Sequence, residues 1–338
     1  MEYPSYGTPP AGSIRFNTDS FKMEIYNGEK WWEIDDSASA TSASRSLFAG
    51  GEAGPAQVNT ITFVQTMTTG NTIDFGDLTD TGDSSGNSSR TRGLFFMNNP
   101  DRQSVDYVNI QSTGNGTDWG NLNAAVWMRG TASDGTRALW AGGLYPGSTT
   151  HADISYVTIA QNGSSADFGD LAASATNKEG TNSPTRACFG GGAGNSAPLN
   201  SIEYVTIQSL GNGLDFGDLV DDLRSALTSS SPTRGVYAGG KDVDSPSNNY
   251  FAHIEYITFT TLGNGSDFGD LTSGRAGGSH QTGNAIRGVF GGGYNAGGKS
   301  DVIDYITMSS LGNAIDFGNL TIANQYNAGC CSGHGGIK

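Results

Sequence analysis

The chain has 338 residues, of which 51 are glycine and 10 are proline, and its formal net charge at pH 7 is −15. So acidic a chain lacks the basic patch that nucleic acids and anionic membranes require, which disfavours both as partners. No apolar run approaches the roughly 18 residues of a membrane-spanning helix, so we expect no membrane insertion. Short runs rich in Thr, Ser, Val, Ile and Tyr, separated by glycine, predict an all-β protein.

Residues 1–36 differ from the rest of the chain and predict a short N-terminal β module. Residues 13–20 and 22–34 have the pattern of three short strands, with a tight turn at Asn27-Gly28. A module this short has little core of its own, so its aromatic side chains need a surface to cover them. That surface belongs either to the rest of the chain or, as we favour, to a partner protein. The candidate docking residues are Phe16, Tyr26, Trp31 and Trp32.

Residues 37–44 are small and polar, which predicts a flexible linker. From residue 45 onward, a tripeptide of aspartate, an aromatic residue and glycine recurs six times, at steps of 44, 49, 48, 52 and 49 residues, and an arginine keeps the same rhythm. A fixed period in this range indicates a repeat architecture. The tripeptides begin at Asp74, Asp118, Asp167, Asp215, Asp267 and Asp316, and the arginines are Arg45, Arg92, Arg137, Arg186, Arg234 and Arg287.

Each repeat divides into four short segments, which we name strands a to d in chain order. In the last complete repeat they are the small and polar residues 275–282, the apolar residues 286–293, the β-branched and aromatic residues 302–308, and residues 315–320 after a Gly-Asn turn. Four antiparallel strands per unit, repeated six times, predict a six-bladed β-propeller. Strand a is built of small residues, as the innermost strand near a central axis requires.

The two ends of the repeat region predict how a propeller of residues 45–338 would close. The first repeat begins at strand b and lacks a strand a of its own, whereas residues 324–336 supply an extra segment of that type. We expect this C-terminal strand a to pair with the N-terminal strand b, because the pairing would remove two exposed sheet edges.

The repeats resemble two known groups of proteins. An R-x-G element, an aromatic residue before paired glycines (residues 236–240) and an apolar strand with tyrosine (residues 202–204) are similar to a degenerate kelch repeat over residues 45–338. A second sequence motif resembles repeats in virion proteins of marine tailed phages, cyanophages especially. It is Ile-Asp/Glu-Tyr-Ile/Val-Thr followed by Leu-Gly-Asn-x-x-Asp-Phe-Gly-Asp-Leu. The N-terminal module of residues 1–36, with the segments AGSIRFNTDS, YNG and WWEI, looks like short N-terminal modules of phage tail and fibre proteins.

These resemblances imply a structural protein of the virion, in which the N-terminal module docks on the particle or forms a homotrimer. Its expected partners are other virion proteins and a glycan or protein of the host surface. A capsid or tail decoration protein, which cements the particle without binding a receptor, is the main alternative. An intracellular kelch-type adaptor is a third.

The residues point away from catalysis. The four histidines lie in different repeats without metal-ligand spacing, and the three cysteines form no paired framework, so we expect no enzyme, no metal and no cofactor. Cys188, Cys330 and Cys331 are expected to be small buried side chains. We expect each repeat arginine to form an ion pair with a repeat aspartate, rather than to build an anion site, and the aspartates to hold no calcium.

The loops between strands b and c vary most in length, and loops on a rigid scaffold commonly carry recognition. The three that stand out are residues 144–153, 241–253 and 294–301, although ordinary surface loops could have the same composition. We expect exposed aromatic residues there to stack on a sugar or protein surface. The candidate binding residues are Tyr145, His151, Asn248, Asn249, Tyr250, Phe251 and Tyr294.

Overall fold

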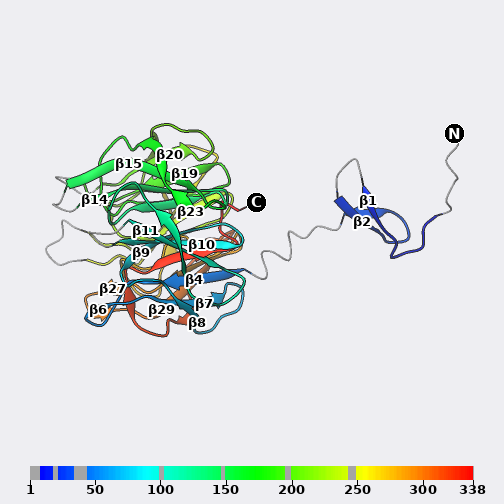
Figure 1. Ribbon diagram of the computed structural model, residues 1–338, viewed down its shortest axis with the longest axis horizontal. Coiled ribbons are helices and arrows are strands. Elements are labelled where there is room, and N and C mark those ends of the chain that lie inside the picture. The colour runs from blue at the N-terminus through cyan, green and yellow to red at the C-terminus, as the bar shows by residue number, and fades with distance from the viewer. Residues whose placement is uncertain are drawn as a thin grey trace. The chain divides into compact units, whose positions relative to one another are not determined.

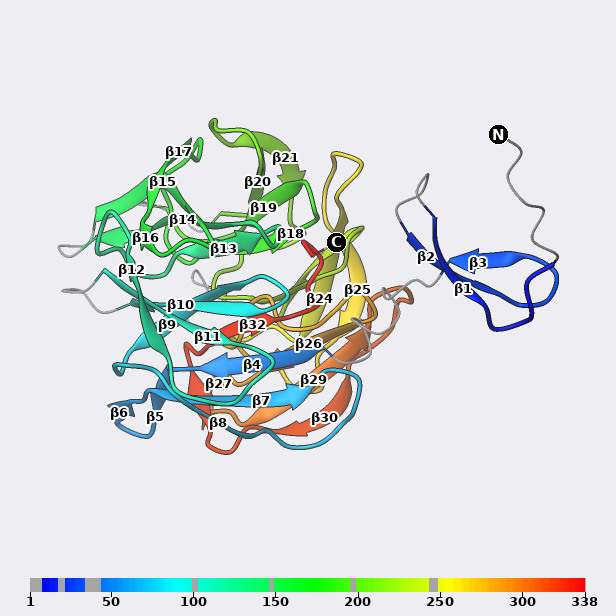
Figure 2. The same cartoon turned by 45° about the vertical axis from the view of Figure 1, so that its right-hand side comes forward.

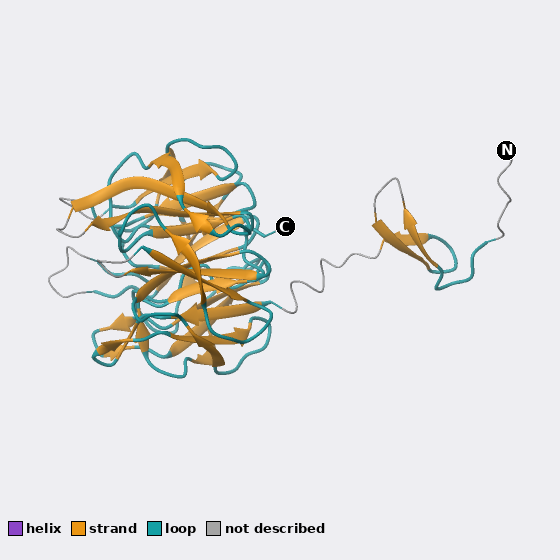
Figure 3. Cartoon of the chain, in the orientation of Figure 1, coloured by secondary structure: helices purple, strands orange, loops and turns teal. Residues whose placement is uncertain are grey.

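The computed structural model describes residues 8–17, 22–33, 44–98, 103–145, 149–194, 199–242 and 249–337. The chain forms two compact units, Met1–Ser42 and Ala43–Lys338, which we call the leader and the repeat unit. Every regular element in the described residues is a β-strand (Figure 3), which confirms the all-β prediction. These residues accordingly contain no helix that is long and apolar enough to cross a membrane.

The leader contains the three strands that its sequence predicts. They are β1 (Ile14–Asn17), β2 (Lys22–Tyr26) and β3 (Trp31–Glu33), and they pair antiparallel in the order β1-β2-β3. The turn between β2 and β3 is held by Asn27, whose Oδ1 accepts hydrogen bonds of 2.9 Å from the amides of Glu29 and Lys30.

The repeat unit consists mainly of antiparallel sheets of about four strands, in which neighbours in the chain are usually neighbours in the sheet (Figures 1 and 2). We number the main sheets 1 to 6 in chain order and write each from its strand a outward. Sheet 1 is β32 (Ala328–Cys331), β4 (Arg45–Ala49), β7 (Thr60–Gln65) and β8 (Ile73–Asp77); sheet 2 is β9 (Asp83–Ser88), β10 (Arg92–Asn98), β11 (Ser104–Asn109) and β12 (Thr117–Asn121); sheet 3 is β13 (Gly130–Ser133), β14 (Arg137–Tyr145), β15 (Thr149–Thr158) and β17 (Ala166–Asp170).

The remaining sheets repeat this order with smaller additions. Sheet 4 is β18 (Glu179–Asn182), β19 (Arg186–Gly190), β20 (Ser201–Thr206) and β21 (Leu214–Asp218); sheet 5 is β22 (Leu227–Ser230), β23 (Arg234–Ala238), β24 (His253–Thr258) and β25 (Ser266–Asp270); sheet 6 is β26 (Arg287–Gly291), β29 (Val302–Thr307) and β30 (Ile315–Asn319). The additions are β5 (Glu52–Ala53), β6 (Ala56–Gln57), β16 (Gly163–Ser164), β27 (Tyr294–Asn295), β28 (Gly298–Lys299) and β31 (Asn324–Gln325).

The C-terminal strand β32 pairs antiparallel with β4, in the register Ala328↔Ala49 to Cys331↔Ser46. The innermost strands of successive sheets also lie beside one another: β32 contacts β9, β9 contacts β13, β13 contacts β18, and β18 contacts β22 (Figure 2). The small side chains of these strands permit this close approach.

The sequence prediction is wrong for strand a of sheet 6. Residues 275–282 form no strand in the structure; only isolated bridges occur nearby, at Ala276 and Gly283. The physical reason lies in the backbone, because Gly277, Gln281 and Gly283 have φ values of 64°, 57° and 118°. Residues in this left-handed region cannot continue an extended ladder.

The core lies between neighbouring sheets. One cluster, for example, packs Phe168 and Leu171 of sheet 3 and its following turn against Phe189 and Val205 of sheet 4. The side chains of Cys188, Cys330 and Cys331 are buried and free, as expected for small core residues.

Neighbouring sheets are joined by one repeated contact between the tripeptide and the Gly-Asn turn of the next repeat. The amide of Gly114 donates a hydrogen bond of 2.8 Å to the carbonyl of Phe75, and the amide of Asp77 donates one of 3.1 Å to Asn115 Oδ1. The glycine and aromatic partners recur, at 2.8 to 2.9 Å, as Gly211 with Phe168, Gly263 with Phe216, Gly312 with Phe268, and Gly70 with Phe317. The last of these pairs joins sheet 1 to sheet 6.

The repeat arginines do not pair with the repeat aspartates, and that prediction is wrong. No ion pair links the two sets across the described ranges, and each of the six aspartates is exposed. Each arginine instead places its guanidinium 4.4 to 5.0 Å from the centre of an aromatic ring in strand c of its own sheet. Five of them also donate to a backbone carbonyl of the next sheet; Arg234, for example, donates to Met308 at 2.9 Å. The ring face and the carbonyl supply the negative partner that we had assigned to aspartate.

Candidate functional site

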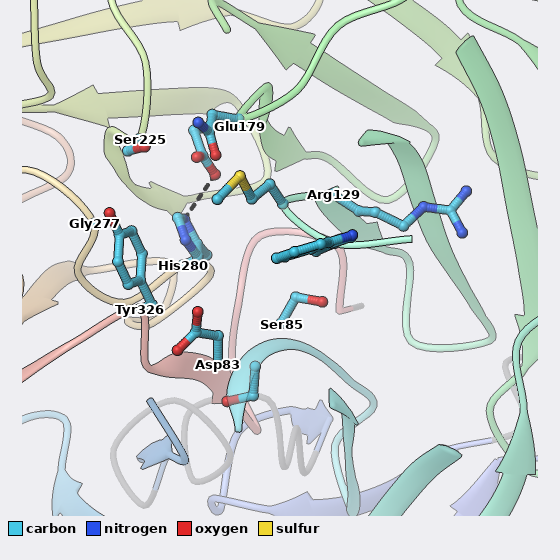
Figure 4. Close-up of a pocket in the computed structure, with 12 residues that line it drawn as sticks. Asp83, Ser85, Arg129, Glu179, Ser225, Gly277, His280 and Tyr326 are labelled. Carbon is cyan, nitrogen blue, oxygen red and sulfur yellow. Dashed lines mark ion pairs between the residues drawn. The ribbon is translucent and has the colours of Figure 1, made fainter. Parts of the chain in front are cut away.

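One cavity of about 40 Å³ in the repeat unit is lined by residues from all six sheets (Figure 4). We call it the inner pocket, because its lining residues lie within or just before the innermost strands of sheets 1 to 5, at their N-terminal ends, or within residues 275–282, which precede sheet 6. One residue from each repeat represents the lining: Asp83, Trp127, Glu179, Ser225, His280 and Tyr326.

A left-handed residue stands at the same place in five of the repeats around the pocket. Met128, Asn177, Ser225, Gly277 and Tyr326 have φ values of 53° to 64°, and all five line the cavity. A non-glycine residue in this conformation costs roughly 1–2 kcal/mol, and such residues concentrate at functional sites. The chain therefore turns sharply at the pocket wall before each inner strand begins.

The pocket carries two carboxyl groups, one of the buried Glu179 and one of the half-buried Asp83. Glu179 Oε2 lies 2.9 Å from His280 Nδ1 in an ion pair (Figure 4). Burial raises the pKa of Glu179, and the facing His280 opposes that rise. Burial, together with the charge of Glu52, also raises the pKa of Asp83 to about 6. Asp83 is therefore ionised only above about pH 6, and the carboxyl of Glu179 is balanced by His280.

Six side-chain atoms of the lining residues have no hydrogen-bond partner within the described residues. Of these, His280 Nδ1 is in the ion pair with Glu179, and Arg129 Nε and Nη1 belong to a guanidinium that is directed away from the cavity. The other three are Asp83 Oδ1, Ser85 Oγ and Trp127 Nε1. Buried polar groups in native proteins almost always have a partner, so three such atoms around one cavity need an explanation. Figure 4 shows Asp83 and Ser85 beside the cavity, and the guanidinium of Arg129 directed away from it.

Two side chains connect the inner strands. In the segment before sheet 6, Gln281 Nε2 donates hydrogen bonds of 2.5 Å to the carbonyl of Gly180 and 3.4 Å to that of Thr131. At the C-terminal ends of the inner strands, His334 Nε2 lies 2.9 Å from the carbonyl of Ser88. Its Nδ1 accepts from the amide of Gly336, so the imidazole is neutral. Burial lowers the pKa of His334 to about 4.

Two of the predicted loop residues lead to the inner pocket. The ring centres of Tyr250 and Tyr294 are 5.4 Å apart, and those of Tyr294 and Tyr326 are 5.5 Å apart. We call Tyr250, Tyr294 and Tyr326 the tyrosine ladder; it runs from the loop of residues 241–253 to the pocket wall. A side chain at Gly277 would clash with it, because its Cβ would lie 2.8 Å from Tyr294 Cε1 and 3.0 Å from Tyr326 Cε1.

Two more predicted residues are connected to Arg129 on the side of its guanidinium, which is directed away from the cavity. The ring centres of Tyr145 and His151 are 3.7 Å apart, and His151 Nδ1 lies 2.9 Å from Asp153 Oδ1. The other oxygen of Asp153 lies 2.9 Å from Arg129 Nη2, and Arg129 lines the pocket. The structure thus brings two separate loops to one end of the repeat unit.

The other loop candidates agree less well with the expectation of exposed aromatic binding residues. Phe251 is half-buried and packs against the core cluster that contains Leu223 and Phe259, so the expectation of an exposed stacking residue is wrong for it. Tyr145, Tyr250 and Tyr294 are also half-buried, because they pack on one another or on histidine. Asn249 is exposed, and its carbonyl accepts from the amide of Asp242. Asn248 lies outside the described residues.

His253 stands between two carboxylates next to the same loop. Its Nε2 lies 3.1 Å from Asp221 Oδ2 and 3.0 Å from Glu255 Oε1. The hydrogen bond to Glu255 is the main reason why the pKa of His253 is raised. These three side chains form the one group in the described residues that could hold a metal ion, although the raised pKa of His253 favours the protonated imidazole, which is not a metal ligand.

The four candidate docking residues of the leader lie on opposite faces of its sheet. Phe16 and Trp32 are 54% and 52% exposed, on the face that also carries the exposed side chains of Ile14, Met23 and Ile25. Tyr26 and Trp31 occupy the other face, with ring centres 5.2 Å apart, and Arg15 lies over Trp31. Only Phe16 and Trp32 therefore belong to a continuous exposed apolar surface, which we call the leader face.

Sequence reasoning missed the inner pocket. The one sequence feature that could have indicated the pocket is a constant spacing: its left-handed residues lie ten positions after the aspartate of each tripeptide. They are Met128, Asn177, Ser225, Gly277 and Tyr326. Five residue types at one repeat position give no motif, and the spacing alone does not reveal the left-handed backbone. The chain matches no protein-family model, and no curated protein matches it.

Proposed function

We propose that the repeat unit is a six-bladed kelch-like β-propeller, with sheets 1 to 6 as its blades and the pairing of β32 with β4 as its closure. Two observations support this arrangement. The Gly-Asn turn of sheet 1 contacts the tripeptide of sheet 6 in the same way as in four other neighbouring pairs. The inner strands of successive sheets lie side by side.

We further propose that the protein is a non-enzymatic structural component of a phage virion, and that the propeller binds a glycan or protein of the host surface. The virion assignment rests on the resemblance of the repeats and the leader. The observation that carries the binding role is the difference between the two ends of the repeat unit. One end combines the inner pocket, the tyrosine ladder and the loops of variable length, whereas the tripeptides and arginines serve contacts between sheets.

The leader face suits attachment to another virion protein. Five apolar side chains stand next to one another on its three strands, and each is at least 38% exposed. Exposed apolar groups on a small sheet mark an interaction surface. The occupant we propose is an apolar surface of another virion protein.

Adhesion of the full chain to host cells tests the binding role. A double variant, Tyr250→Ala with Tyr294→Ala, removes the outer part of the tyrosine ladder and should abolish adhesion. Asp215→Asn is a matched control, because this exposed aspartate belongs to the tripeptide. Unchanged adhesion of the double variant, or hydrolysis of the bound glycan, would contradict the proposal.

One observation favours the alternative of a decoration protein. Six large apolar side chains next to the tripeptides or in the Gly-Asn turns are 57% to 59% exposed, and they come from the neighbouring sheets 4, 5, 6 and 1. They are Ile73, Leu210, Leu214, Leu262, Leu311 and Ile315. If these residues cement the particle, serine substitutions at Leu210, Leu262 and Leu311 should make virions fall apart while host adsorption stays normal.

A further inference from the structure

We propose that the inner pocket binds the edge of one neutral sugar residue, with Asp83 and Trp127 as its polar partners and the tyrosine ladder as the platform for the adjoining residues of the glycan. This inference deepens the proposed function and rests on it. It assigns the ligand class and the residues that recognise it.

The first argument is the set of unpartnered polar atoms in the lining. Asp83 Oδ1 is an acceptor, Trp127 Nε1 is a donor, and Ser85 Oγ, on a side chain that is only 3% exposed, can do either. A sugar edge with two hydroxyl groups offers both donors and acceptors, so it can satisfy all three atoms at once. A ligand that supplies these missing hydrogen bonds is preferred over one that does not, because the latter leaves the buried groups without partners.

The charge and chemistry of the lining exclude two other ligand classes. An anion would be repelled by Asp83, which is ionised above about pH 6, in a chain whose net charge is −15. An ammonium group has donors only, so it would leave the indole N–H of Trp127 without a partner. A neutral polyhydroxylated molecule can pair with both the donors and the acceptors among the unpartnered atoms.

The size of the cavity limits how much of the ligand can enter. A water molecule needs about 10–15 Å³ of cavity volume measured in the same way, so 40 Å³ accommodates roughly three. That is room for one edge of a sugar ring with its hydroxyl groups, and not for an oligosaccharide. The rest of the glycan must lie outside the pocket.

The tyrosine ladder provides the surface for the rest of the glycan. Tyr326 stands in the pocket wall, and Tyr294 and Tyr250 continue from it toward the loop of residues 241–253. Each tyrosine combines an apolar ring with a hydroxyl group, a combination that suits the apolar and polar faces of a sugar. The ammonium of Lys241 lies 5.6 Å from the ring centre of Tyr250, over one face of that ring, so a ligand there must use the remaining half-exposed surface of the ladder. Ordered aromatic rings also lose little conformational entropy on binding.

The test compares matched variants of the full chain. The probes are glucose, galactose, mannose, rhamnose and N-acetylglucosamine, followed by a glycan array, with affinity measured by calorimetry or saturation-transfer NMR. Asp83→Asn and Trp127→Phe should each weaken binding of the best sugar at least tenfold. Trp140→Phe should not, although Trp140 Nε1 is also buried and unpartnered, because Trp140 does not line the pocket. Circular dichroism and thermal melting check that each variant folds.

The outcomes separate this inference from the proposed function. Sugar binding that is lost in Asp83→Asn and Trp127→Phe and kept in Trp140→Phe supports the inference. Adhesion and sugar binding that persist in both pocket variants but fail in the tyrosine double variant overturn the inference and leave the proposed function standing. If ethanolamine or inorganic phosphate binds the pocket and no sugar does, the ligand class is wrong. If the full chain neither binds sugars nor adheres to host cells, both proposals fail.

Discussion

The backbone amide of Gly114 donates a 2.8 Å hydrogen bond to the carbonyl of Phe75, and this contact joins sheet 2 to sheet 1. Its equivalents recur at four other junctions, including the one between sheets 6 and 1. The most regular motif of the sequence therefore serves the contacts between neighbouring sheets.

The glycine of the tripeptide should be intolerant of any side chain. Gly217 has a φ of 143°, and a Cβ there would lie 2.5 Å from the backbone of Gly263 in the next repeat. We expect Gly217→Ala to destabilise the protein by roughly 2–4 kcal/mol, because the backbone of both sheets must shift. Gly211→Ala is the control, since Gly211 has a similar φ of 154° and nothing lies within 4 Å of its Cβ position. Urea unfolding curves measure both, and equal losses would show that the junction is not the cause.

The repeat arginine should act through a ring and a carbonyl. Arg234 lies 4.8 Å from the ring centre of Tyr256 and donates to the carbonyl of Met308. We expect Arg234→Ala to cost roughly 1–3 kcal/mol and Asp267→Asn less than about 0.5 kcal/mol. A double-mutant cycle should give coupling of about 0.5 kcal/mol or more between Arg234 and Tyr256, tested as Tyr256→Leu, and almost none between Arg234 and Asp267. Strong coupling to Asp267 would restore the ion-pair interpretation.

His334 should make the protein sensitive to acid. Its pKa is 6.5 in the unfolded chain and about 4 in the folded protein, so the unfolded state binds a proton first as the pH falls. The stability due to the neutral imidazole is therefore complete above about pH 6.5 and is lost down to about pH 4, a difference of roughly 3 kcal/mol. His334→Gln cannot titrate and should lose about 2–3 kcal/mol less than the unmodified protein between pH 7.5 and 4.5. Equal acid sensitivity in urea titrations would contradict this assignment.

The sequence predicts strands b, c and d of every sheet because their β-branched and aromatic residues recur at constant offsets. It fails at strand a of sheet 6, where Gln281 adopts a left-handed conformation that no residue type announces. It also assigns the wrong partner to the arginines. Equal numbers of arginine and aspartate suggest ion pairs, whereas the actual partners include backbone carbonyls, which every residue carries and which leave no signal in the sequence.

The candidate site was predictable only in part. The length variation of the loops points to the end of the repeat unit where the pocket lies, and Tyr250 and Tyr294 approach the pocket through Tyr326. Asp83 and Trp127 could not be found in this way, since they differ from the residues at the equivalent positions of other repeats. A pocket lined by one or a few residues from each repeat is assembled from non-equivalent side chains, so comparison between repeats conceals it.

Asp83 should cost the protein stability in the absence of a ligand. Because its folded pKa of about 6 exceeds its ordinary value of 3.8, the folded state binds the proton more tightly, and stability falls as the pH rises through 6. Asp83→Asn should therefore stabilise the protein at pH 7.5 by roughly 1–3 kcal/mol, with the gain fading toward pH 4. Thermal melting at both pH values measures it. A loss of stability at pH 7.5 would show that the carboxylate is structural, contrary to a site in which stability is sacrificed for binding.

The C-terminal strand should be essential to the repeat unit. Deleting residues 328–338 removes β32, which leaves β4 without its partner and strips the inner contact with β9. We expect a loss of more than about 4 kcal/mol or of cooperative unfolding altogether, because an exposed sheet edge and part of the core open together. Deleting only residues 332–338 keeps the strand and removes the tail that contains His334, so the loss should be smaller. A synthetic peptide of residues 324–337 should rescue the longer deletion by adding the missing strand, as strand complementation does elsewhere. If the longer deletion melts like the intact protein, the pairing of β32 with β4 does not hold the repeat unit together.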